Sequence, residues 1–188
     1  MLGSKERILA VVVEILETDG YDAVQLREVA RRARMSLATI YKHYGTRDEL
    51  ILAALDTWML TNRYAGITPH GREPGEPLYP ALMRIYRSIF EPWERHPAML
   101  TAYVRARSAP GGDKLARRGF DVVVPAAMAV LAGVDEGFIA DLDLVISNLV
   151  YGSWGRYAAG EIAITEILAG LDRAVYWMVR GYEKGTGA

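Results

Sequence analysis

The chain has 188 residues, of which 51% are hydrophobic and 24% are charged, so its composition favours one folded domain, or a small domain joined to a larger one, and excludes extensive disorder. The formal net charge of −1 excludes a generally basic nucleic-acid coat, and the absence of cysteine excludes disulfides and thiolate chemistry and favours a reducing cytoplasm. No apolar run is long enough to span a membrane, and the charges near the N-terminus argue against a signal peptide.

The first segment has the apolar periodicity of an amphipathic helix. One face of this helix carries Ile8, Val12, Ile15 and Leu16. Ser4 is expected to cap the helix at its start, and Gly20 is expected to end it. A second, short helix is predicted over residues 25–33, where small and aliphatic side chains recur on one face.

Two further helices are predicted from their capping residues. Ser36 is a good N-cap for a third short helix, whose Ile40 would point inward. Thr46 and Glu49 have the spacing of a capping box, which predicts a fourth helix that continues towards Tyr64.

The segment from Thr68 to Pro77 contains three prolines and two glycines, and it is predicted to be a loop. Helical patterns resume beyond it over residues 78–94, 97–107, 114–132, 135–158 and 165–183. Pro125 lies inside one of these segments and predicts a kink or a break there. Since no segment alternates like a strand, the fold class is predicted to be all-α, with about nine helices.

Positive charge is concentrated between residues 27 and 47. The cations are Arg27, Arg31, Arg32, Arg34, Lys42 and Arg47. Glu28 is the only acid in this stretch, so six cations and one acid give it a local charge of +5. A solvated helix face is the simplest interpretation of such a run. Two short helices joined by about three residues also form a helix-turn-helix unit, whose second helix, from Ser36 to His43, can enter a DNA major groove.

The sequence GYDAVQLREVARRARMSLATIYKHYGTRDELILAAL, residues 20–55, resembles the TetR family of bacterial transcriptional regulators. The resemblance is carried by the family's characteristic glycine-aromatic, "IA", "TLY", aromatic and leucine positions, which are here Gly20, Tyr21, Val29, Ala30, Thr39, Ile40, Tyr41, Tyr44 and Leu50. Arg34 departs from the family, which often has glycine in this turn, and a positive φ would strain an arginine. Val24 and Gln25 stand where threonines often open the second helix, and Arg47 replaces a lysine.

The resemblance implies an N-terminal three-helix helix-turn-helix DNA-binding domain over residues 1–47, followed by a larger helical ligand-binding and dimerisation domain over residues 48–188. The DNA contacts that it implies are Gln25, Arg27, Ser36, Leu37, Ala38, Thr39, Tyr41, Lys42, His43, Tyr44 and Arg47. Three of them have an alternative role, because Tyr41 could lie partly in the core, His43 could be an ordinary surface residue and Tyr44 could serve packing alone.

Large aromatic and sulfur-containing side chains are frequent after residue 48, and such side chains line cavities for apolar molecules. The resemblance implies a small-molecule pocket whose candidate lining is Trp58, Tyr86, Phe90, Trp93, Met99, Tyr103, Phe120, Met128, Asn148, Tyr151 and Trp154. Each of these residues could instead fill an ordinary helical core.

The last helix carries a long apolar stripe made of Ile164, Ile167, Leu168, Leu171, Val175, Met178 and Tyr182. This stripe could pack inside the chain, or it could form a four-helix bundle in a homodimer through the last two helices. Gly152 and Gly155 lie within otherwise good helix, and we expect another helix to approach them closely.

The resemblance implies a ligand-responsive transcriptional regulator that binds a palindromic operator in double-stranded DNA as a homodimer. It is expected to be a repressor that a small apolar effector releases, with activation as the alternative. The C-terminal segment and the sequence GYDAVQLREVA are similar to actinobacterial sterol-catabolism repressors, which implies a lipid-like, steroid-like or acyl-thioester effector. A planar aromatic or cationic drug is the alternative effector. The alternative is a helical small-molecule-binding protein without sequence-specific DNA binding. An enzyme is not expected, because the chain has no cysteine and only three dispersed histidines. We expect no cofactor, no metal and no membrane partner, and a cytoplasmic location.

Overall fold

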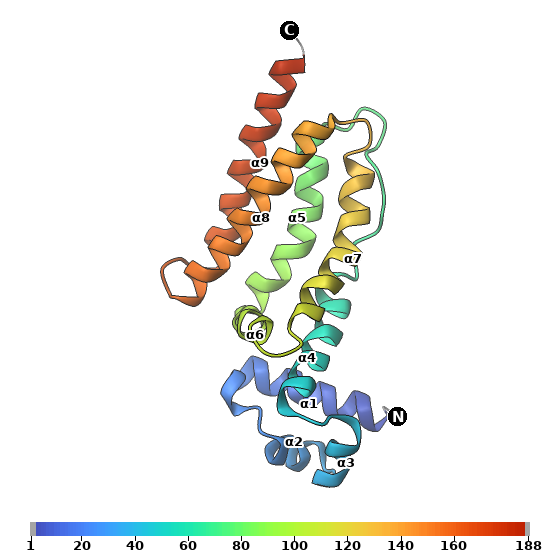
Figure 1. Ribbon diagram of the computed structural model, residues 1–188, viewed down its shortest axis with the longest axis vertical. Coiled ribbons are helices and arrows are strands. Elements are labelled where there is room, and N and C mark those ends of the chain that lie inside the picture. The colour runs from blue at the N-terminus through green and yellow to red at the C-terminus, as the bar shows by residue number, and fades with distance from the viewer. Residues whose placement is uncertain (1–2, 187–188) are drawn as a thin grey trace. The chain divides into compact units, whose positions relative to one another are not determined.

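A computed structural model describes residues 3–186, and within them every element is a helix (Figure 1). The α-helices are α1 (Ser4–Thr18), α2 (Leu26–Ala33), α3 (Leu37–His43), α4 (Arg47–Trp58), α5 (Leu78–Arg95), α6 (Pro97–Arg107), α7 (Asp113–Val130), α8 (Glu136–Ala158) and α9 (Thr165–Thr186). Two short turns complete them, the 3-10 helix η1 (Tyr21–Ala23) and the π-helix η2 (Met59–Arg63). The predicted all-α class and the nine predicted helices are confirmed for this range.

The described residues form two compact units. The first runs up to Ala65 and also includes His96–Gly119, so it contains α1 to α4 and α6. The second comprises Gly66–Arg95 and the residues from Phe120 onward, with α5, α8 and α9. The predicted boundary after residue 47 falls inside the first unit, and a functional division there stays a prediction. No helix in residues 3–186 combines the length and apolarity that crossing a membrane requires.

In the first unit, α1 packs against α2, α4 and α6. The apolar face predicted for α1 forms part of the core, since Ile8, Val12, Ile15 and Leu16 are all fully buried. The residue that caps α1 is Gly3 rather than the predicted Ser4, which is the first helical residue and accepts no capping bond. The helix ends at Thr18, just before Gly20, whose φ of 86° suits glycine.

Two predicted caps are confirmed. The Ser36 hydroxyl accepts a hydrogen bond from the Thr39 backbone N–H at the start of α3. The Thr46 hydroxyl accepts from the Glu49 N–H at the start of α4, while the Glu49 carboxylate accepts from the Gly45 N–H. The return bond therefore reaches one residue further back than in the usual capping box.

The turn between α2 and α3 places Arg34 in the left-handed region, at φ 54° and ψ 49°. Arg34 therefore has the positive φ that is expected at a position where the family often has glycine. This conformation costs about 1–2 kcal/mol for a residue with a side chain.

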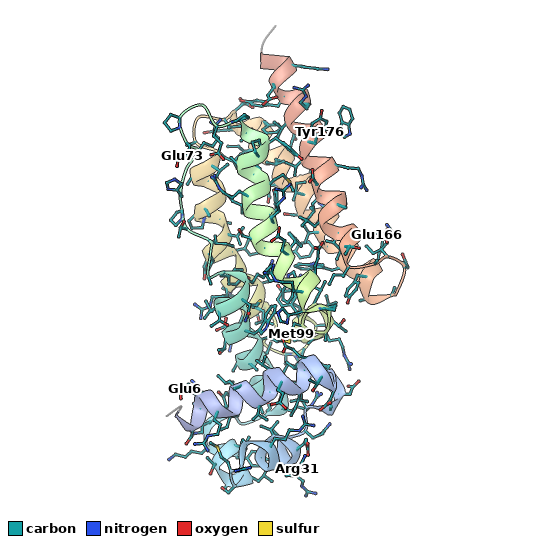
Figure 2. All side chains as sticks on the ribbon, turned by 180° about the vertical axis from the view of Figure 1, so that it is seen from behind. Glu6, Arg31, Glu73, Met99, Glu166 and Tyr176 are labelled. Atoms are coloured by element: carbon teal, nitrogen blue, oxygen red, sulfur yellow. The ribbon has the colours of Figure 1, made fainter. Side chains whose placement is uncertain are left out.

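In the second unit, α9 packs against both α5 and α8. The stripe on α9 points into this packing, because Ile167, Leu171 and Val175 are buried within the chain itself. The expectation that these three residues serve a partner chain is therefore wrong. Tyr176, labelled in Figure 2, is partly exposed on α9, and its ring lies edge-on to that of Tyr79 on α5 with 5.5 Å between the ring centres. The predicted break at Pro125 is absent, since α7 continues through it to Val130.

Candidate nucleic-acid interface

The short helix α3 exposes one face and buries the other. Ile40 is fully buried and fixes the helix to the core, whereas Ala38, Tyr41, Lys42 and His43 are exposed. Tyr41 keeps 53% of its surface accessible, which is unusual for a large aromatic side chain. The Ser36 hydroxyl oxygen accepts the capping bond and also lies 2.8 Å from the Thr39 hydroxyl. Both hydroxyl groups are therefore already hydrogen-bonded within α3 and its cap. This face offers apolar, hydroxyl and cationic groups on an α-helix, the element that a major groove admits.

The start of α2 contributes two further candidate residues. Gln25 is the N-cap residue and is exposed, but its amide caps nothing and instead donates to the Asp22 carbonyl at 3.1 Å. Arg27 is exposed and makes no ion pair or hydrogen bond within residues 3–186. Lys42 and Arg34 are likewise exposed and without a carboxylate partner in the described range. These three cations are therefore available to an anionic partner.

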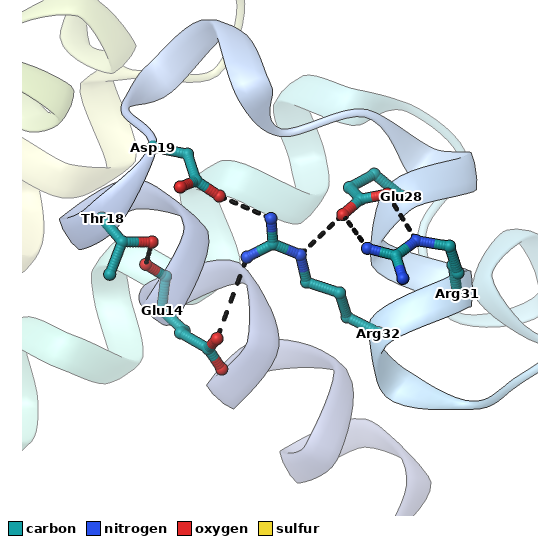
Figure 3. A network of polar contacts seen from close by, with 6 residues as sticks. All are labelled: Glu14, Thr18, Asp19, Glu28, Arg31 and Arg32. Atoms are coloured by element: carbon teal, nitrogen blue, oxygen red, sulfur yellow. Dashed lines mark hydrogen bonds and ion pairs between the residues drawn. The ribbon is translucent and has the colours of Figure 1, made fainter.

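Arg31 and Arg32 are engaged with acids on the same unit (Figure 3). Both guanidinium groups lie 2.6 Å from the Glu28 carboxylate, and Arg32 also reaches Asp19 at 2.6 Å and Glu14 at 3.8 Å. Hydrogen bonds from Arg31, and then from Arg32, lower the pKa of the Glu28 carboxyl to about 2. The network ties α2 to the end of α1, so part of the +5 charge of this segment stabilises the fold instead of facing a ligand.

Arg47 points into the protein. Its guanidinium donates to the carbonyl oxygens of Val24 and Tyr21, both at 2.5 Å, and lies 4.8 Å from the centre of the Tyr21 ring. A guanidinium with two strong backbone acceptors is already satisfied. The predicted contact of Arg47 with a DNA phosphate therefore stays a prediction that competes with these bonds.

Tyr44 is 6% exposed, and its hydroxyl is buried without a hydrogen-bond partner in the described residues. Burial raises the pKa of this hydroxyl, and the nearby Glu6 carboxylate adds to the effect. This burial agrees with the packing role that was the alternative to DNA contact, and a contact of Tyr44 with DNA stays a prediction. Leu37 and Thr39 are half-buried, so each offers only part of its side chain to a partner.

The candidate ligand-lining residues do not share one environment. Trp58, Met99 and Tyr103 are buried in the first unit, and Phe90, Trp93 and Trp154 are buried in the second. The Tyr86 hydroxyl is strongly desolvated, which raises its pKa.

The remaining candidates, Phe120, Met128, Asn148 and Tyr151, are exposed. The Asn148 amide donates to the Leu144 carbonyl at 2.7 Å, one turn back on α8. A pocket in the second unit has a lining that includes none of the predicted residues, namely Gly71, Arg72, Glu73, Gly75, Glu76, Ala129 and Ala132. The predicted ligand lining therefore stays a prediction.

Large apolar side chains are exposed on α8 and α9 in the single chain. They are Leu144, Val145, Tyr151, Tyr176 and Trp177. Leu144 is 62% and Trp177 is 69% exposed, and several large apolar side chains exposed on the same two helices are typical of an interaction surface. Sequence reasoning missed this surface because it followed the most regular stripe of α9, and that stripe belongs to the core. The signal for it was α8, whose apolar residues continue around the whole helix.

Comparison with known proteins identifies the family. Residues 8–54 match the family described as "Bacterial regulatory proteins, tetR family", and residues 75–178 match "Tetracyclin repressor-like, C-terminal domain". The HTH-type transcriptional repressor KstR of Rhodococcus jostii is 31% identical over 102 residues, which cover 54% of this chain and 46% of that protein. KstR of Mycobacterium tuberculosis is 28% identical over 180 residues, covering 93% and 80% of the two chains. The matches span about half the length of the R. jostii and Mycolicibacterium smegmatis relatives.

Solved structures share the fold. A TetR transcriptional regulator from Rhodococcus sp. RHA1 superposes with a TM-score of 0.67 at 19% identity, over 93% of this chain and 96% of the other. A TetR-like regulator from the same source gives 0.63 at 17% identity, over 96% and 100%. Because the C-terminal family match alone covers more than half of the residues, and the N-terminal match covers the helix-turn-helix, the chain belongs to the TetR family of bacterial regulatory proteins.

Proposed function

We propose that the chain is a ligand-responsive transcriptional repressor that binds a palindromic operator in double-stranded DNA as a homodimer. The observation that carries this proposal is the exposed face of α3, where Tyr41, Lys42 and His43 stand outward from a helix that Ile40 fixes to the core. A short helix that is anchored on one side and polar on the other is the form in which helix-turn-helix proteins read a major groove. Such a regulator acts where bacterial DNA is, in the cytoplasm.

The candidate contacts divide by chemistry. Arg27 and Lys42 are cations that pair with no carboxylate among residues 3–186, so they suit phosphate contacts, which supply affinity and its dependence on salt. Ala38 and the methyl group of Thr39 suit thymine methyls, and Gln25 suits an adenine edge. Ser36 and Tyr41 offer hydroxyls to the backbone. Leu37 and His43 complete the set of candidate contacts. We leave out Tyr44 because its side chain is buried, and Arg47 because its guanidinium bonds to backbone carbonyls.

The exposed apolar surface of α8 and α9 is the proposed dimer interface. An added Cβ at Gly152 or Gly155 would meet no atom within 4 Å, so no close approach within residues 3–186 explains these glycines in the middle of α8. Each costs about 1 kcal/mol relative to alanine in a helix. A second copy whose helices approach α8 closely accounts for both glycines, and it would cover Leu144 and Trp177.

A small apolar effector, lipid-like or steroid-like, is proposed to release the repressor from DNA. The buried aromatic and methionine side chains of both units supply the kind of lining that such molecules need. The relatives named KstR are transcriptional repressors by their names, which agrees with a repressor role for this chain. Because effector and operator would be coupled thermodynamically, bound DNA must weaken effector binding by the factor by which effector weakens DNA binding.

The decisive experiment is the selection of bound duplexes from a random DNA pool by the purified protein, with its mass in solution measured by light scattering. The expected result is an enriched palindrome bound by a particle of two chains. Failure to enrich any sequence, together with no salt-dependent binding, would leave a helical small-molecule-binding protein and overturn the proposal. A Lys42→Ala variant tests the site directly, and Lys114→Ala, an exposed lysine on α7, is the control with the same loss of charge.

A further inference from the structure

The ring of Tyr21, in η1, lies close to two guanidinium groups. The Arg47 guanidinium, from α4, is 4.8 Å from the ring centre, and that of Arg105, from α6, is 4.4 Å from it. Arg105 also donates two hydrogen bonds to the neighbouring Asp22 carboxylate, at 2.7 and 2.8 Å. These bonds lower the pKa of the Asp22 carboxyl. The turn that precedes α2 is therefore held by two helices that lie outside α2 and α3.

This turn determines how α2 begins. Gly20, with φ 86°, allows the chain to change direction after α1, and α2 has no side-chain cap of its own. The Gln25 amide donates to the carbonyl of Asp22, so the N-cap residue of α2 is bonded to the residue that Arg105 holds. Since α2 packs directly against α3, the position of this turn is passed on to the recognition helix.

We propose that Arg105 is a positioning residue for DNA binding: from α6, it holds Asp22 so that α2 and α3 keep the geometry that the operator requires. This inference rests on the proposed function. In it, Arg105 acts through Asp22 and does not itself contact DNA. A bidentate pair between a guanidinium and a carboxylate fixes orientation as well as distance, which a single-point contact does not. Because the Asp22 side chain is 80% exposed, the contribution is that of a surface pair, and losing it should weaken binding about fivefold.

Two neutral variants, Arg105→Gln and Asp22→Asn, separate positioning from simple electrostatics. If only the overall field of the protein mattered, loss of the arginine would weaken DNA binding and loss of the aspartate would strengthen it. Positioning predicts that both variants weaken binding by a similar factor, and that the double variant is no weaker than either single one, since one pair is broken in each case. The slope of log affinity against log salt should stay unchanged, because no phosphate contact is lost.

The probe is the duplex that the wild-type protein enriches from the random pool, titrated at several salt concentrations. Arg117→Gln is the matched control, because it also removes one arginine and one ion pair, that with Asp113 on α7, but touches nothing in η1. Thermal melting shows whether each variant is folded. Equal binding by all variants, opposite effects of Arg105→Gln and Asp22→Asn, or additive effects in the double variant would overturn the positioning role while leaving the repressor intact. If the wild-type protein enriches no duplex, the proposed function itself fails and the positioning role fails with it.

Discussion

The Ser36 hydroxyl contacts two polar groups of Thr39: it accepts from the backbone N–H at 3.1 Å and lies 2.8 Å from the side-chain hydroxyl. One small residue therefore fixes both the beginning of the recognition helix and the orientation of a side chain proposed to touch DNA. Stability and recognition are coupled at this position, and two substitutions can separate them.

Ser36→Ala removes the cap and should lower the free energy of unfolding by about 1 kcal/mol, measured by urea titration. Ser36→Asp keeps an acceptor for the Thr39 N–H, so its stability should stay close to that of the wild-type protein. The new carboxylate would stand beside the DNA phosphates, however, and should weaken binding to every duplex. A Ser36→Asp protein that is stable and binds as tightly as the wild type would remove the start of α3 from the interface.

Lys42→Ala should weaken binding to specific and nonspecific duplexes alike, because the side chain is exposed, cationic and unpaired in the described residues. Loss of one phosphate contact should reduce the salt slope by about 0.9. The measurement is a titration of fluorescent duplex at several salt concentrations, with Lys114→Ala as the reference. An unchanged slope in Lys42→Ala would mean that this lysine meets no phosphate.

The local signals in the sequence predicted most of the helix-turn-helix. The caps at Ser36 and Thr46 depend on residues three positions away, so spacing alone identifies them. The positive φ at Arg34 could be anticipated because an arginine stands where related sequences have glycine. Such features are decided within one turn of chain, and no tertiary contact is needed to find them.

The partners of charged residues could not be predicted in the same way. A run of cations shows that positive charge is present, but not that Arg32 reaches back to Asp19 on the preceding segment, or that Arg47 bonds to carbonyls more than twenty positions earlier. The periodicity of apolar residues also says nothing about which partner covers a helix face. It found the apolar face of α9, but only the packing of α5 and α8 shows that Leu171 is covered within the chain while Trp177 is not.

This difference on α9 gives a paired prediction. Leu171→Glu buries a charge in the core of the second unit and should cause loss of cooperative unfolding or several kcal/mol of destabilisation, followed by circular dichroism. Trp177→Glu changes an exposed residue and should leave the helical signal intact while converting the proposed dimer to monomers in light scattering. If the Trp177→Glu protein folds and remains dimeric, the dimer interface lies elsewhere.

The Glu28 carboxylate provides a dependence of stability on pH whose sign is fixed by its bonds to Arg31 and Arg32. Because these bonds lower its pKa from 4.5 to about 2, the folded state releases this proton more readily than the unfolded state does. The contribution is therefore fully present above the unfolded pKa of 4.5 and is lost as the pH falls through about 2. Glu28→Gln lacks the carboxylate, so it should be less stable than the wild-type protein near neutral pH, and the difference should shrink steadily below 4.5. Urea titrations of both proteins across this range measure it, and a difference that stays constant with pH would show that Glu28 does not make the bonds to Arg31 and Arg32 drawn in Figure 3 in solution.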